Sequence, residues 1–256
     1  MALVQAMNDL PAPDSDSRPP VGDFATTHWS VVLAAAEGSS PAAQAALETL
    51  CRTYWQPLYA FARRQGHSQA DAEDLIQSYF ERLIGRDGFR NVSREKGRLR
   101  SFLLVSLKRF LVNEWHRSRT EKRGGTRVFI PLDTVTAEAQ YDIEAAQELS
   151  AEIIFDRRWA AALLETVFNK LGDESAAAGN SELFAAFKES LGADGEQTSQ
   201  AAIAMRLGMT ENAVKQAFHR MRGRYQKLLR LEVANTVAAP GDIEDELRHL
   251  ISVLRG

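Results

Sequence analysis

The sequence predicts an all-α fold with two helical domains joined by a linker, and the second domain contains a helix-turn-helix. Apolar residues recur at three- and four-residue steps through most of the chain, and the strict apolar–polar alternation of strands is not found. Stretches rich in glycine or proline separate the periodic segments. We expect a disordered extension at 1–25, helical domains at 26–119 and 150–234, a linker at 120–149, and an amphipathic tail at 235–256.

The composition describes a soluble globular protein. Its 256 residues are 45% hydrophobic and 25% charged, and no apolar run approaches the roughly 20 residues that a membrane span needs. Residues 1–20 lack the cationic start and apolar core of a secretory signal. Cys51 is the single cysteine, so no intrachain disulfide can form, which fits the reducing cytosol. We therefore expect a cytoplasmic protein that does not associate with a membrane.

The charge is segregated along the chain. The net charge is −3, but residues 86–123 hold twelve basic and four acidic side chains, and residues 212–231 hold six basic and no acidic ones. Residues 131–198 hold four basic and fourteen acidic side chains. Because DNA responds to positive potential within a Debye length of about 8–10 Å, two basic blocks indicate two contact surfaces. The alternative for any single block is an ordinary solvated helix face.

The helices follow from the apolar periodicity and from the breaks between periodic segments. Pro41 suits a first helical turn, whereas Pro57 should bend or interrupt its helix because proline lacks a backbone donor. We expect helices near Thr27 and at 41–65, 71–84, 101–119, 137–171, 181–191, 199–230 (a helix, a turn and a longer helix) and 242–254.

The segment 199–230 carries the most specific local signal. Gly208 stands where a helix C-terminus favours a residue tolerant of positive φ, and Thr210 can cap the following helix. The buried face of that helix is expected to be Val214, Ala217, Phe218, Met221, Tyr225 and Leu228, and the opposite face to be Asn212, Gln216, His219 and Lys227. This pattern matches a helix-turn-helix that lays its second helix in the major groove.

Two helices of the first domain carry further signals. In 71–84, Asp74, Gln77 and Glu81 share one stripe opposite the apolar face, which indicates a protein-docking surface; the alternative is a routine surface helix. The helix 101–119 has too many apolar residues for one narrow stripe, and its remaining side is basic. Cations beside aromatic rings suit single-stranded DNA, although the aromatic residues could instead belong to the core.

The order of these motifs resembles the extracytoplasmic-function (group IV) sigma factors of bacterial RNA polymerase. DAEDLIQSYFERLI at 71–84 is similar to the segment that docks on the polymerase β′ coiled coil. SFLLVSLKRFLVNEWHRSR at 101–119 is similar to the segment that melts and reads the minus-ten element. AAIAMRLGMTENAVKQAFHRMRGRYQKLL, which begins at Ala201, is similar to the helix-turn-helix that reads the minus-thirty-five element. The resemblance covers about 45–232. The linker and the N-terminal extension are longer than the minimal family pattern, which indicates a divergent subgroup.

The resemblance also implies roles for individual residues. Asp74, Gln77 and Glu81 would bind polymerase. Minus-ten DNA would be contacted by Phe89, Arg98, Arg100, Phe102, Lys108, Arg109 and Trp115. Upstream DNA would be contacted by Thr210, Asn212, Lys215, Gln216, His219, Arg220, Arg222, Arg224 and Lys227. The sequence departs from the family's usual Trp at Phe102, Asn at Arg109, Asp at Asn113 and an acid at Ala202.

The implied partners are core RNA polymerase, through its β′ and β subunits, and promoter DNA; an inhibitory anti-sigma protein is a further partner that the family offers. A rival interpretation is a stand-alone helix-turn-helix regulator with an N-terminal sensor domain. An enzyme is disfavoured because the sequence has no phosphate-cradling glycine loop, nucleophile elbow or metal-ligand cluster, so no cofactor or metal is expected. A helical scaffold would leave the charge segregation unexplained.

Overall fold

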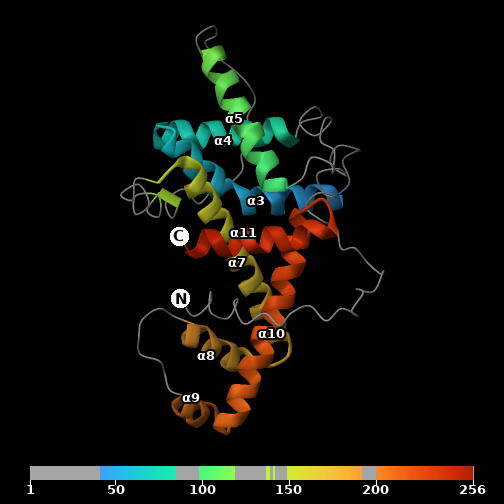
Figure 1. Cartoon of the computed structure of the whole chain (residues 1–256). Helices are drawn as coiled ribbons and strands as arrows, with labels where there is room; N and C mark the ends of the chain where they lie inside the picture. The colour runs from blue at the N-terminus through green and yellow to red at the C-terminus, as the bar shows by residue number, and fades with distance from the viewer. Residues whose placement is uncertain are drawn as a thin grey trace. The chain divides into compact units, whose positions relative to one another are not determined.

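The computed structural model describes residues 41–84, 98–118, 137–138, 141, 149–191 and 200–255. Every regular element in these ranges is helical, which confirms the all-α prediction for the described part of the chain (Figure 1). None of these helices is long and apolar enough to cross a membrane. The helix expected near Thr27 and nearly all of the predicted linker lie outside the described residues.

Most of the observed helices lie where the sequence predicts them. They are α3 (Pro41–Arg64), α4 (Gln69–Ile84), α5 (Leu99–Ser118), α7 (Ala151–Ala177), α8 (Ser181–Leu191), α9 (Gln200–Leu207), α10 (Glu211–Thr236), the 3-10 helix η2 (Pro240–Asp242) and α11 (Ile243–Arg255). Pro57 lies inside α3 and does not interrupt it. The predicted bounds of 137–171 are wrong, because α7 begins only at Ala151, after Leu149 and Ser150 outside any helix, and continues six residues beyond 171. α10 likewise ends six residues after the predicted end at 230.

The described helices fall into two compact units. The α3–α5 unit contains α3, α4, α5, the first turns of α7 up to Ala162, and Ala234–Glu246. The α8–α10 unit contains α7 from Leu163, α8, α9, α10 up to Val233, and α11 from Leu247.

Large aromatic side chains form the core of the α3–α5 unit. The largest fully buried ones are Tyr54, Tyr59, Phe61, Phe80, Phe155 and Trp159. Burying a side chain of this size stabilises the fold by roughly 1.5–3 kcal/mol relative to leaving it exposed. α3 and α4 pack against one another across a tight turn, in which Gly66 has a φ of +95°. Ser68 Oγ then caps α4 by accepting a hydrogen bond from the Asp71 N–H at 3.2 Å.

A buried tyrosine fixes α5 against α4. The Tyr79 hydroxyl donates to the Leu103 carbonyl at 3.1 Å and lies 2.5 Å from Ser106 Oγ. The Tyr79 ring also meets the Phe110 ring edge-on, with 5.7 Å between the centroids. Burial raises the pKa of Tyr79, so the phenol stays protonated and keeps its donor. The outer faces of α4 and α5 are therefore held in a defined relation to each other.

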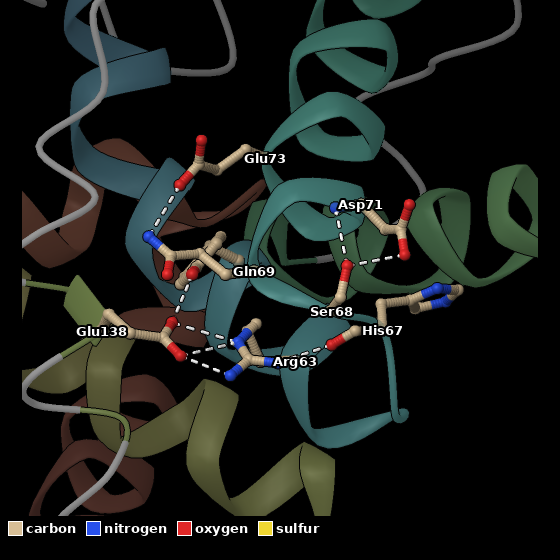
Figure 2. A network of polar contacts seen from close by, with 8 residues as sticks. Arg63, His67, Ser68, Gln69, Asp71, Glu73 and Glu138 are labelled. Atoms are coloured by element: carbon tan, nitrogen blue, oxygen red, sulfur yellow. Dashed lines mark hydrogen bonds and ion pairs between the residues drawn. The ribbon is translucent and has the colours of Figure 1, made fainter.

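A polar network fastens the segment before α7 to the end of α3 (Figure 2). Glu138 accepts hydrogen bonds from the Tyr59 hydroxyl and from the Arg63 guanidinium, whose Nε lies 3.0 Å from both carboxylate oxygens. Arg63 also donates to the His67 carbonyl at 2.6 Å and lies over the Tyr141 ring, 4.9 Å from its centroid. Tyr141 packs with Ala60 and Ile154, so this attachment combines charge with apolar burial.

Aromatic contacts also organise the α8–α10 unit. The Phe187 ring of α8 meets the Phe218 ring of α10 edge-on at 5.4 Å between centroids. Phe168 of α7 stacks on Phe187 at 6.5 Å and meets Tyr225 edge-on at 6.1 Å. These rings anchor the middle of α10, so its opposite face is left to solvent.

Candidate polymerase and nucleic-acid interface

The outer face of α4 carries the residues predicted to dock on a protein. Asp74 is exposed and Gln77 and Glu81 are half-buried, whereas Ile76 and Phe80 on the other side are fully buried. The structure therefore places the three candidates on one accessible stripe, as their spacing predicts. Two carboxylates and an amide on a rigid helix can accept hydrogen bonds from basic side chains of a partner. Whether polymerase is that partner stays a prediction.

α5 divides its many apolar residues between two faces. Leu103, Leu107 and Phe110 are buried, whereas Val105, Val112 and Trp115 are 48%, 55% and 53% exposed. Val112 is an exposed apolar residue that the periodicity did not single out, although it lies seven residues after Val105. Exposed cations accompany these side chains, namely Lys108 and Arg109. An exposed helix face that mixes apolar, aromatic and cationic groups fits unstacked bases and their phosphates.

The candidate minus-ten residues differ in their burial and in their contacts. Phe89 lies outside the described residues, and Phe102 is half-buried. Lys108 forms an ion pair with Glu152 at 2.7 Å and lies 5.5 Å from the centre of the Phe61 ring. Both partners of that pair are nearly half exposed, so solvent screens it and a phosphate can replace Glu152.

Arg98 and Arg100 have a different environment from the other candidate cations. Arg100 is buried, and its guanidinium contacts Glu246 Oε1 at 2.6 Å, Asp156 Oδ1 at 2.9 Å and the face of the Trp159 ring at 5.1 Å. Arg98 Nε contacts Glu246 Oε2 at 2.9 Å. Sequence spacing could not find these acidic partners because they lie far along the chain, beyond the reach of any local pattern. The acidic run that ends at Glu246 was visible only as part of an amphipathic tail.

α9, a glycine turn and α10 have the local geometry that the sequence predicts. Gly208 has a φ of +61°, and the Met209 N–H donates to the Ala204 carbonyl at 2.9 Å to close the end of α9. Thr210 Oγ1 accepts a hydrogen bond from the Ala213 N–H at 3.2 Å and caps α10. Thr210 therefore acts as a cap in this structure, and its contact with DNA stays a prediction.

The outer face of α10 gathers most of the candidate upstream-DNA residues. The exposed ones are Asn212, Lys215, Gln216, His219, Arg220, Arg224 and Lys227, and Arg222 is half-buried. Every residue predicted for the opposite, buried face is buried. Arg224 forms two hydrogen bonds with Glu174 of α7, at 2.7 and 2.5 Å. These bonds lower the pKa of Glu174, but both side chains are more than 40% exposed, so the pair is weak.

The comparisons with known proteins identify one domain. Residues 50–121 match the family model described as Sigma-70 region 2, and this range includes α4, α5 and most of α3. Searches of the curated proteins and of the solved structures each found no significant match. The chain thus contains a sigma-70 region 2 domain, which points to a sigma-factor role in RNA polymerase binding and promoter recognition.

Proposed function

We propose that this chain is a sigma factor of the extracytoplasmic-function (group IV) type, from a divergent subgroup, that acts in the cytoplasm. It binds core RNA polymerase, directs it to a class of promoters and promotes opening of the minus-ten element. The observation that carries the proposal is the region 2 match at 50–121, within which Asp74 on α4 and Lys108, Arg109 and Trp115 on α5 are exposed. The chain itself catalyses no reaction; polymerase supplies the chemistry.

The outer faces of α4, α5 and α10 have different roles in this proposal. Asp74 and Gln77, with Glu81, contact the β′ subunit. The α5 face captures unstacked bases of the minus-ten strand on Trp115, where a stacked base contributes roughly 1–3 kcal/mol. On α10, Gln216 and its exposed neighbours read base edges in the upstream major groove, whereas Arg222, Arg224 and Lys227 bind phosphate and set the register.

The test is run-off transcription with core polymerase and the purified chain. The double variant Asp74→Lys with Gln77→Ala should abolish polymerase binding and transcription. Asp173→Lys is a matched control, since it makes the same charge reversal at an exposed position of α7. Normal association of the double variant with polymerase would remove the docking claim, and no transcript with the wild-type chain would remove the function.

A stand-alone regulator is the second candidate, and the geometry of α9 and α10 favours it equally. A glycine turn, a capped second helix and an exposed polar face are what any helix-turn-helix protein needs. A band-shift assay separates the two functions. A regulator binds duplex DNA by itself, whereas a sigma factor requires polymerase for tight binding.

A further inference from the structure

One carboxylate near the C-terminus, that of Glu246, forms ion pairs with both Arg98 and Arg100 at the start of α5. Arg98 Nε lies 2.9 Å from Glu246 Oε2, and Arg100 Nε lies 2.6 Å from Glu246 Oε1. The Glu246 side chain is completely buried, whereas Arg98 is 32% exposed. All three residues belong to the α3–α5 unit. Glu246 lies in this unit together with η2 and the first residues of α11.

Two guanidinium groups around one anion form a site that also suits phosphate. Arginine presents planar pairs of N–H donors that match carboxylate and phosphate oxygens alike. Arg100 is held independently of Glu246, because Asp156 accepts from its Nη1 at 2.9 Å and Trp159 lies against its guanidinium. Removal of Glu246 would therefore leave Arg100 in place, with Arg98 at the solvent side of the site.

We propose that Glu246 is an internal competitor that fills a phosphate site formed by Arg98 and Arg100, and that the backbone of the opened promoter strand displaces it. This inference rests on the proposed function, since both arginines precede or begin the helix assigned to the minus-ten strand. In the free chain the site is closed by the chain's own carboxylate. Tight DNA binding then requires the residues around Glu246 to leave the α3–α5 unit.

The test compares two variants of the full chain that change the net charge equally. Glu246→Gln removes the competing charge, whereas Glu244→Gln removes an exposed charge two residues away. We expect Glu246→Gln to bind a fluorescein-labelled single-stranded oligonucleotide about tenfold more tightly than wild type, as charge-assisted hydrogen bonds to one phosphate would give. Glu244→Gln should bind like the wild type.

The salt dependence and a double variant identify the site. The plot of log Kd against log salt should steepen by about 0.7 for each additional phosphate that the protein neutralises on a single strand. Adding Arg98→Gln to Glu246→Gln should cancel the increase in affinity. Equal affinities for Glu246→Gln and Glu244→Gln would overturn the proposal, and so would an increase that survives the loss of Arg98.

A measurement on the wild-type chain covers the case in which Glu246→Gln does not fold. Hydrogen exchange of peptides from 240–246 should become faster when polymerase-bound protein opens a promoter, and unchanged exchange would overturn the proposal. The experiments test the proposed function separately from the role of Glu246 as a competitor. If the wild-type chain supports no polymerase-dependent transcript, the function is wrong; if it does, and the two glutamine variants bind DNA equally, only the competitor is wrong.

Discussion

Two glycines in the α8–α10 unit show how residue-scale geometry fixes the turn before α10. Gly208 has a left-handed φ of +61°, whereas Gly223 lies inside α10 without a positive φ, and an added Cβ would meet nothing within 4 Å at either position. We expect Gly208→Ala to lower the free energy of unfolding by about 1–2 kcal/mol, because an L-residue is strained there. Gly223→Ala should raise it by about 0.5–1 kcal/mol through helix propensity.

Chemical denaturation of both variants checks this prediction. Each variant adds one methyl group in open space, so the opposite signs isolate backbone conformation from packing. Stabilisation by both substitutions would mean that the turn at Gly208 adopts another conformation in solution.

Residue roles were predictable where the signal is local. The left-handed turn at Gly208 and the cap at Thr210 follow from neighbours within a few positions, and both are confirmed. The partners of Arg98 and Arg100 were not predictable, because Glu246 and Asp156 approach only after the chain folds. Both arginines remain candidates for DNA, but in this structure carboxylates hold them.

At the scale of elements, Glu138 attaches the segment before α7 to α3, and the attachment should depend on pH. Hydrogen bonds from Arg63 hold the pKa of Glu138 below its ordinary value of 4.5. A lowered pKa in the folded state gives stability that is present above the unfolded pKa and is lost as pH falls through the folded one. We expect Glu138→Gln to destabilise the α3–α5 unit by about 1–3 kcal/mol at neutral pH.

Unfolding of wild type and Glu138→Gln across pH 3 to 7 tests this. The difference between them should begin to shrink as the pH falls below about 4.5, because the carboxyl of the unfolded chain then takes up a proton while the folded chain keeps Glu138 ionised to a lower pH. Glu174→Gln is the control, since the pKa of Glu174 is also lowered but its pair with Arg224 is exposed and screened. A difference that is constant down to pH 3 would show that Glu138 is not ionised in the attachment.

Elements were predicted well where amphipathic periodicity is strong. α8 has the predicted bounds, and α4 and α5 begin two residues before the predicted starts. At Pro57, tertiary packing outweighs the tendency of proline to interrupt a helix. The residues around it on α3 are buried on most sides, including Tyr54, Leu58 and Phe61, and this burial outweighs one lost backbone hydrogen bond. The sequence could not predict that Val105 and Val112 are the exposed apolar residues of α5, because a valine at either position would also suit a buried face.

At the scale of the whole molecule, a net charge of −3 coexists with basic faces on separate helices. This arrangement predicts two kinds of defect in promoter use. Gln216→Ala should relax the preference at one upstream position, with a loss of about 1–3 kcal/mol of discrimination. Arg224→Ala should weaken all sequences alike and reduce the salt slope by about 0.9.

Selection of promoters from a library randomised in the upstream element, with polymerase carrying each variant, measures both effects. Wild type provides the reference preference, and unfolding of the free variants excludes a folding defect. Identical behaviour of Gln216→Ala and Arg224→Ala would show that α10 does not divide into base-reading and phosphate-binding residues.

The all-α class and the positions of the main helices could be predicted because they depend on periodicity and turns. The composition of the compact units could not, since Ala234–Glu246 joins α3–α5 although the whole of Leu163–Val233 separates it from Ala162 in the sequence. The region 2 match supports the coarse function, whereas individual contacts with polymerase and DNA depend on partners that the chain does not itself contain.

The only cysteine has a practical consequence. Cys51 is buried in α3, with 3% of its surface exposed, so the native thiol is shielded from reagents. A fluorophore attached by maleimide chemistry to a new surface cysteine would consequently mark one site without prior removal of Cys51. The rate at which Cys51 itself reacts would report how often α3 opens.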